Sequence, residues 1–169
     1  MGASLAEIES VYRSRGADFL RLALARTGQV ETAREAVQEG FARAIRGRFS
    51  YRGTGSLDAW IARCVINVAQ DLVRKPRLGA HGEAGAQMAS NGRPEQGTVS
   101  PPGLEAGIVR AAVRQLPQRQ RDALYLRFYL GFDYAAIAET LGIGIGTVSA
   151  TLHAARAGLA HNLKEEVSG

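Results

Sequence analysis

The sequence predicts an all-α protein in which two small helical domains are joined by a flexible linker. Apolar residues recur at helical spacing on both sides of one central segment, and no run of residues reads as a credible strand. That segment, residues 76–103, holds six of the 20 glycines and four of the five prolines but no aromatic residue. It offers too little apolar surface to offset the entropy of ordering it. We therefore expect one domain over residues 1–75 and a second, a four-helix domain with a helix-turn-helix, over residues 104–169.

Capping boxes mark the first two helices of the N-terminal domain, because a Ser or Thr is followed three residues later by Glu. Ser4 with Glu7 predicts the first helix, and Thr32 with Glu35 predicts a second helix that Gly47 ends. The side chains expected to face the core are Leu5, Ile8, Tyr12, Phe19 and Leu22 of the first helix and Ala33, Val37, Phe41, Ala44 and Ile45 of the second.

A glycine-rich loop, residues 48–56, follows the second helix and carries both aromatic and arginine side chains. Unstacked bases pile onto aromatic rings while their backbone meets cations. Phe49, Tyr51 and Arg52 therefore favour a contact with single-stranded nucleic acid. The alternative interpretation is that the aromatic residues belong to the core and that the arginines are merely exposed.

The third helix is predicted over residues 57–75, with Ser56 as its cap and Pro76 as its stop. Its buried stripe is expected to consist of Trp60, Ile61, Cys64, Val65, Val68 and Leu72. A second face carries Arg63, Asn67, Gln70 and Arg74.

The C-terminal domain is predicted to hold a helix-turn-helix over residues 134–153. Ala138 is small where two helices cross, and Gly142 lies where the turn requires a left-handed residue. The predicted helices are 104–116 with an apolar stripe of Ile108, Val109, Ala112 and Val113, then 118–130, 134–141 and 146–163.

The second helix of that motif would lie in the major groove of duplex DNA. Its outward residues are Ser149, Ala150, His153 and Arg156, which provide one firm positive charge where several cations would be expected to meet phosphates. The alternative is a helical hairpin that has only a structural role and binds no DNA.

The charge balance favours an acidic partner, and the remaining composition excludes several classes of protein. The net charge is +5, and the pI is about 9.9. One cysteine, Cys64, excludes an intramolecular disulfide and a multi-cysteine zinc site, and we expect no metal or cofactor. We find no motif for nucleophilic or acid–base catalysis, so no catalytic residue is assigned. The aspartates are interpreted as caps and surface charges: Asp18, Asp58, Asp71, Asp122 and Asp133.

No apolar stretch approaches the roughly 20 residues that span a bilayer. The N-terminus also lacks the basic and apolar regions of a secretory signal. We therefore expect a cytoplasmic protein without membrane insertion.

The sequence resembles the bacterial RNA polymerase sigma factors of the extracytoplasmic-function (ECF) group. Three runs carry this resemblance: AREAVQEGFARAI, FSYRGTGSLDAWIARCVINVAQDLVR and LPQRQRDALYLRFYLGFDYAAIAETLGIGIGTVSATLHAARAGL. The first block is similar to conserved region two of that family, and the second block is similar to region four. Two motif sets in the family's order are more specific than either set alone.

The resemblance implies partners and site residues. Core RNA polymerase would bind through its beta-prime clamp helices and its beta flap, and an anti-sigma factor is implied by the group. Without the resemblance, the outward face of the second helix is open to two interpretations: it binds a partner, or it is an ordinary solvent-exposed face with an ion pair. The resemblance implies that Glu35, Gln38, Glu39 and Arg43 bind the clamp helices of the polymerase.

Promoter DNA would be contacted by both domains. The loop from Phe49 to Ser56 and the following helix would capture a flipped base of the −10 element, and region four would read the −35 element. The DNA-binding residues implied are Phe49, Tyr51, Arg52, Ser56, Trp60, Arg63, Asn67, Arg74 and Lys75 in the first block and Thr147, Ser149, Ala150, His153 and Arg156 in the second.

Several positions depart from the family's pattern. Ser149, Thr151 and Ala154 stand where it usually has basic residues, so we expect region two to carry more of the promoter affinity than is usual. In the second helix, Arg34 replaces an acid and Gly40 an aliphatic residue. Two further interpretations stay open: a stand-alone helix-turn-helix regulator, and a degenerate module that binds polymerase or an inhibitor.

Overall fold

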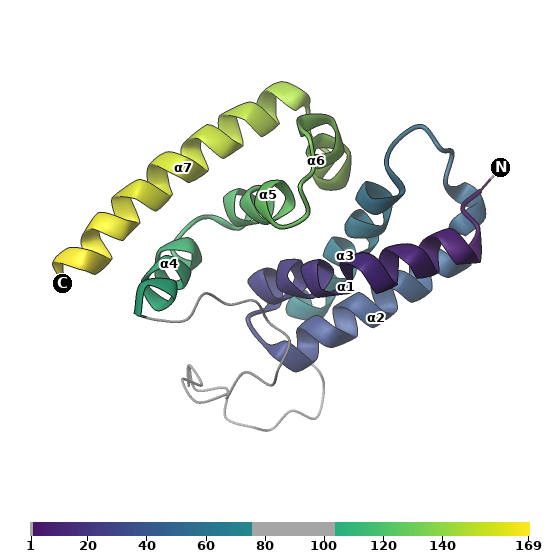
Figure 1. The fold of residues 1–169 in the computed structure, drawn as a ribbon, viewed down its shortest axis with the longest axis horizontal. Helices are drawn as coiled ribbons and strands as arrows, with labels where there is room; N and C mark the ends of the chain where they lie inside the picture. Colours follow the sequence, from purple (N-terminus) through teal and green to yellow (C-terminus); the bar gives the residue numbers. More distant parts are fainter. Residues whose placement is uncertain (1, 76–103) are drawn as a thin grey trace.

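The computed structural model describes residues 2–75 and 104–169, which contain seven α-helices, one short 3-10 helix and no strand (Figure 1). The predicted linker, residues 76–103, lies outside the described residues. The elements are α1 (Leu5–Thr27), α2 (Val30–Arg46), η1 (Arg48–Ser50), α3 (Leu57–Arg74), α4 (Leu104–Arg114), α5 (Gln118–Phe128), α6 (Tyr134–Leu141) and α7 (Ile145–Ser168).

The first three helices pack against one another around a core of alanines, larger aliphatic side chains and two phenylalanine rings. Phe19 of α1 and Phe41 of α2 meet edge to face, with ring centroids 5.3 Å apart. Gly40 lies where α2 crosses α3: a Cβ at this position would be 2.8 Å from the Cα of Val65. The departure from the family pattern at Gly40 therefore serves the packing of the two helices.

Some sequence expectations for this domain are wrong. The side chains of Leu5, Tyr12 and Ile45 are exposed by 53%, 49% and 40%. Leu5 opens α1, the Tyr12 ring touches the edge of Phe41 but otherwise faces outward, and Ile45 follows the buried Ala44 by one residue, which turns it about 100° away from the core.

The second capping box is also wrong, whereas the first is confirmed. Ser4 and Glu7 bond reciprocally at the start of α1. Gly28 then takes a left-handed conformation with φ of 73° and reverses the chain at once, so α2 already begins at Val30. The Thr32 hydroxyl donates to the side chain of Gln29, 3.3 Å away, instead of capping a helix.

The C-terminal domain contains the predicted helix-turn-helix. Asp133 caps α6 by accepting from the Ala136 N–H at 2.8 Å, and Gly142 ends it with φ of 66°. The long helix α7 begins at Ile145, and it continues to Ser168, five residues beyond the predicted end. Val109, predicted to be inward on α4, is 45% exposed.

The two domains contact each other through two pairs of helices. In Figure 1, α5 and α6 lie beside the bundle of α1, α2 and α3; the contacts run from α1 to α5 and from α3 to α6. Within residues 2–75 and 104–169 no single helix is long and apolar enough to cross a membrane; α6 and α7 meet the criterion only as a pair, bent by 97°.

Candidate nucleic-acid and polymerase interfaces

The loop between α2 and α3 presents an aromatic ring to solvent. Phe49 lies in the short helix η1 and is 73% exposed. The guanidinium of Arg48 lies over its ring, 4.2 Å from the centroid, and donates to the Ile45 carbonyl at 3.0 Å. Stacking on an arginine holds the ring outward, where a base can reach its other face.

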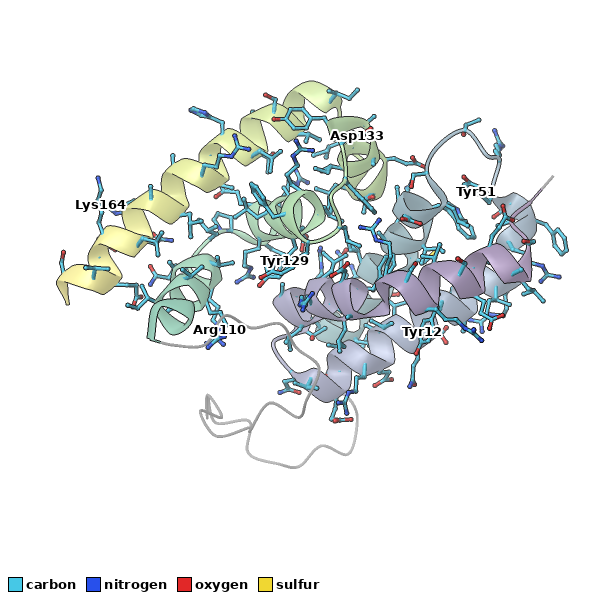
Figure 2. All side chains as sticks on the ribbon, viewed as in Figure 1. Tyr12, Tyr51, Arg110, Tyr129, Asp133 and Lys164 are labelled. Carbon is cyan, nitrogen blue, oxygen red and sulfur yellow. The ribbon has the colours of Figure 1, made fainter. Side chains whose placement is uncertain are left out.

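A hydrogen bond within the loop joins the two ends of its second half. Tyr51 lies beside the loop that leads into α3 (Figure 2). Its hydroxyl donates to the carbonyl of Gly55, and its ring lies 5.6 Å from that of Trp60. Burial raises the pKa of Tyr51, as does the nearby carboxylate of Glu139. Trp60 is half-buried against the core, as the sequence indicated, while Arg52 is exposed near the tip. Contacts within the loop and with Trp60 of α3 therefore hold this half of the loop in a defined conformation.

Helix α3 displays a polar face beside the loop. Arg63, Asn67 and Gln70 are exposed and follow one another along the helix at intervals of three or four residues. No ion pair to Arg63 is found in the described part of the chain. The face has one donor-rich cation and two amides, which pair with base edges through a donor and an acceptor each.

The ends of α3 have structural roles. Ser56 caps the helix by accepting from the Ala59 N–H at 3.3 Å. At the other end Arg74 pairs with Asp71 at 3.3 Å, and Lys75 is the exposed last residue of the domain. The DNA-binding roles expected for Ser56, Arg74 and Lys75 stay predictions.

Helix α2 turns a second polar face to solvent. Glu39 accepts from Arg46 at 2.8 Å and from Arg43 at 3.2 Å, and these hydrogen bonds lower its pKa. Arg43 also reaches Asp71 of α3 at 3.4 Å. Gln38 is exposed, and Glu35 is half-exposed. The four residues predicted to bind polymerase therefore share one accessible and ordered side of α2.

The outward face of α7 is exposed but poor in charge. The side chains of Thr147, Ser149, Ala150, His153 and Arg156 all face solvent. Arg156 provides the one permanent charge among them, and its guanidinium lies 5.9 Å from the ring centroid of the exposed Phe128. The face is positioned as a recognition helix, with few groups for phosphates.

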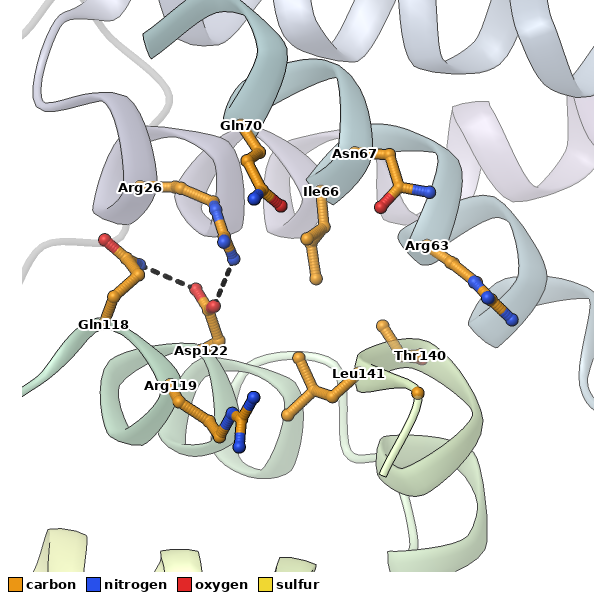
Figure 3. A pocket seen from close by; sticks show the side chains of 11 residues that line it. Arg26, Arg63, Ile66, Asn67, Gln70, Gln118, Arg119, Asp122, Thr140 and Leu141 are labelled. Carbon is orange, nitrogen blue, oxygen red and sulfur yellow. Dashed lines mark hydrogen bonds and ion pairs between the residues drawn. The ribbon is translucent and has the colours of Figure 1, made fainter. Parts of the chain in front are cut away.

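Sequence reasoning missed an ionic cluster between the domains. Asp122, taken for a surface charge, is only 2% exposed; Arg26 of α1 donates to it, and so does Gln118 at 2.9 Å (Figure 3). Burial raises the pKa of Asp122, while the charge of Arg26 acts in the opposite direction. One signal was available: Asp122 precedes the buried Leu126 by four residues and so shares its face.

The comparisons with known proteins agree with this arrangement. Residues 11–78 match the family model for sigma-70 region 2, and residues 106–159 match the model for sigma-70, region 4. The ECF RNA polymerase sigma factor SigL of Mycobacterium tuberculosis is 31% identical over 170 residues, which cover 97% of this chain and 94% of the relative. RNA polymerase sigma factor YlaC of Bacillus subtilis is 28% identical over 160 residues, covering 92% of this chain and 91% of the relative.

A solved structure has the same fold. The sigma factor RpoE of Bartonella quintana, in complex with the anti-sigma factor NepR, matches with a TM-score of 0.72 and 24% identity over 92% of this chain and 95% of that one. The matches to regions 2 and 4, in the order of the two helical domains, define a transcription initiation factor of the sigma-70 class. The chain belongs to the ECF group of RNA polymerase sigma factors. It is thus an alternative sigma factor that directs RNA polymerase to promoters, and it is not an enzyme.

Proposed function

We propose that residues 1–75 bind core polymerase and open the −10 element, that residues 104–169 contact the −35 element, and that residues 76–103 connect them. This division extends the family assignment to named surfaces of this chain. The observation that carries the −10 assignment is that the loop with the exposed Phe49 leads directly into α3, on which Arg63, Asn67 and Gln70 are exposed.

Capture of a flipped base suits this surface. Extruding a base costs a few kcal/mol, which stacking and hydrogen bonds in a protein pocket offset. Phe49 supplies an outward ring, and Asn67 supplies a donor and an acceptor on the adjoining helix. Arg63 stands on the same face, four residues before Asn67, where it would meet the backbone of the displaced strand.

The exposed side of α2 is proposed to dock on the beta-prime clamp helices. Gln38 and Glu39 are its central residues, and the ion pairs of Glu39 with Arg43 and Arg46 preset the side chains before docking. Gly40 and Val65 hold this side at a fixed distance from α3. Polymerase binding and base capture would therefore be performed by two sides of one rigid bundle.

A regulatory partner is also proposed. The RpoE neighbour is bound to an anti-sigma factor, and we propose that this chain is likewise held by an anti-sigma factor in the cytoplasm. Affinity purification from the native cell should return an inhibitor besides polymerase subunits. Recovery of polymerase subunits alone would count against the inhibitor.

Reconstituted transcription tests the assignment of surfaces. Purified chain, bacterial core polymerase and a genomic promoter library are combined, and the transcript starts are sequenced. The wild-type chain should yield promoter-specific transcripts, whereas Gln38→Ala/Glu39→Ala should lose binding to core. A matched control is Glu9→Ala/Arg13→Ala on α1, which removes an exposed ion pair away from the proposed surfaces. Normal core binding by the α2 variant would refute the polymerase assignment.

A further inference from the structure

The short segment before α1 lies against the start of the loop that follows α2 (Figure 1). Ala3 is 4% exposed, and its backbone N–H donates to the carbonyl of Arg48 at 3.0 Å. Gly2 approaches the same backbone closely. A Cβ at Gly2 would lie 2.6 Å from the Arg48 carbonyl oxygen and 2.8 Å from the Cα of Phe49. Two residues without functional groups in their side chains therefore pack against the backbone of η1.

The cap of α1 directs this segment towards η1. The Ser4 backbone N–H donates to the carboxylate of Glu7 at 2.8 Å, and the Glu7 N–H donates to the Ser4 hydroxyl at 3.2 Å. Such a cap fixes the angle at which the chain enters a helix, especially where the flanking apolar residues are packed. Ala3 and Ile8 occupy those flanking positions, and both are buried in the core. Because α1 and α2 are joined by a tight turn at Gly28, the start of α1 lies beside the end of α2 (Figure 1).

The other hydrogen bonds of η1 are local. The Ser50 hydroxyl donates to the Gly47 carbonyl at 2.7 Å, and the guanidinium of Arg48 donates to the Ile45 carbonyl at 3.0 Å. These bonds join residues three apart, so they shape η1 but do not tie it to a distant element. Among the described residues, the bond from Ala3 is the hydrogen bond that links η1 to a segment far away in the sequence.

The bonded carbonyl belongs to the peptide unit that leads directly into Phe49. A peptide unit is planar, so holding the carbonyl of Arg48 also fixes the direction of the bond to the Phe49 nitrogen. The Phe49 ring is 73% exposed, so it is not held by burial in the core. Its direction is therefore set by the backbone of η1 and by the Arg48 guanidinium, which lies 4.2 Å from the ring centroid.

We propose that Gly2 and Ala3 are positioning residues for base capture: they hold the peptide unit before Phe49 and so fix its ring outward before DNA arrives. The proposal rests on the stacking role proposed above for Phe49. Ordering a backbone opposes binding by its loss of conformational entropy. A loop that is already ordered in the folded protein does not lose this entropy when the ligand binds, so its affinity is higher. In this role Gly2 and Ala3 act through η1 and do not contact DNA themselves.

Two substitutions in the full chain release η1 in different ways. Gly2→Ala places a methyl group where the Arg48 carbonyl lies, so the segment and η1 must separate. Ala3→Pro removes the N–H donor. The probe is a fluorescent single-stranded oligonucleotide with the −10 element of a promoter found by reconstituted transcription, and anisotropy measures its binding. If the released ring points outward about one-fifth of the time, the dissociation constant should rise about fivefold in both variants.

A double-variant cycle separates positioning from general damage to the fold. Adding Gly2→Ala to Phe49→Ala should cause no further loss of affinity, because there is no ring left to position. A merely structural role would weaken both backgrounds equally. Leu22→Val is the matched control, because it removes buried volume elsewhere in α1 and lowers stability without touching η1. This control should bind the oligonucleotide as the wild type does, and core polymerase should bind every variant normally.

The single tryptophan of the chain reports on the loop without DNA. The Cη2 atom of Trp60 lies 3.9 Å from the place of a Cβ at Gly47, directly before η1. Release of η1 should therefore raise the quenching of Trp60 fluorescence by acrylamide in Gly2→Ala, even if Ala3→Pro does not fold.

The outcomes distinguish the positioning role from the stacking role on which it rests. If Phe49→Ala weakens DNA binding but Gly2→Ala leaves affinity and quenching at wild-type values, the positioning role alone is refuted. If Phe49→Ala binds fully, base capture by this ring fails, and the positioning role fails with it.

Discussion

The surfaces that we propose contact DNA differ between the two domains in the chemical groups they offer. The first domain presents Phe49, Arg63 and Asn67 as a ring, a cation and an amide on adjoining elements. The exposed residues of α7 between Thr147 and Arg156 are mostly small or neutral, and Arg156 is the one permanent cation among them. If both surfaces contact DNA as proposed, the first has the groups to hold a separated strand. The second offers a single cation to the phosphates of a duplex.

The difference suggests which DNA contact a sigma factor can weaken and still select its promoters. Duplex binding depends on cations that release counterions from the phosphates, so losing them lowers affinity for every sequence. Base capture depends on a few directed groups that no general charge replaces. We therefore expect the −10 surface to decide which promoters this chain uses, with the −35 contact as a weaker aid.

The largest effect should come from Asn67→Ala. Losing a bidentate contact to a base edge costs about 1–3 kcal/mol, so promoter-specific transcription should fall by roughly 5- to 150-fold. The equivalent change on α7, His153→Ala, should lower it less than about threefold. Both residues are exposed, and thermal unfolding should be unchanged. Equal losses from the two variants would break the comparison between the domains.

The positions of these two residues were readable from the sequence, because helical periodicity alone separates the outward Asn67 from the inward Val65 and Val68. The helix-turn-helix was readable for a similar reason, since Gly142 and Asp133 mark its turn and its cap. Local rules determine these features, and they hold whatever the rest of the chain does.

The contact between the two domains was not readable in this way. Arg26 and Asp122 are 96 residues apart, and nothing local distinguishes Asp122 from an ordinary helix-surface charge except its place on the Leu126 face. The second capping box failed for a related reason: the turn at Gly28 fixed the start of α2 before Thr32. Tertiary contacts and the geometry of neighbouring turns override local preference in both cases.

Phe49→Ala should give the next largest effect. Base stacking on an aromatic residue is worth about 1–3 kcal/mol, so binding to a single-stranded −10 oligonucleotide should weaken about tenfold. Phe49→Tyr keeps the ring and is the matched control, expected to bind almost as the wild type does. Anisotropy titrations measure both variants. Full binding by the alanine variant would place the captured base elsewhere, with Tyr51 or Trp60 as the remaining rings.

Gly40→Ala should destabilise the first domain and leave the second domain unchanged. The added Cβ would meet the backbone of Val65 at 2.8 Å, so α2 and α3 must separate, and we expect a loss of about 1 kcal/mol or more in unfolding free energy. Gly16→Ala in α1 is the control, because nothing lies within 4 Å of its added Cβ, and it should stabilise by up to about 1 kcal/mol.

Urea unfolding measures this stability difference. Polymerase binding and single-strand binding should weaken together in Gly40→Ala, since we propose that α2 and α3 carry these two functions on one bundle. Duplex binding through α7 should be unaffected. If polymerase binding alone changed, the two functions of the first domain would not share a rigid support.

The smallest effect should be seen in the salt dependence of duplex binding. Each phosphate contact contributes about −0.9 to the slope of log affinity against log salt. Ser149→Arg/Ala154→Arg should therefore steepen the slope by up to about 1.8, and Arg156→Ala should flatten it by about 0.9. Ala160→Arg adds one positive charge farther along the exposed side of α7 and should change the slope by much less than 0.9. A wild-type slope several times larger than −0.9 would mean that cations outside α7 contact the phosphates of the duplex. In that case the two domains would differ in geometry and not in charge.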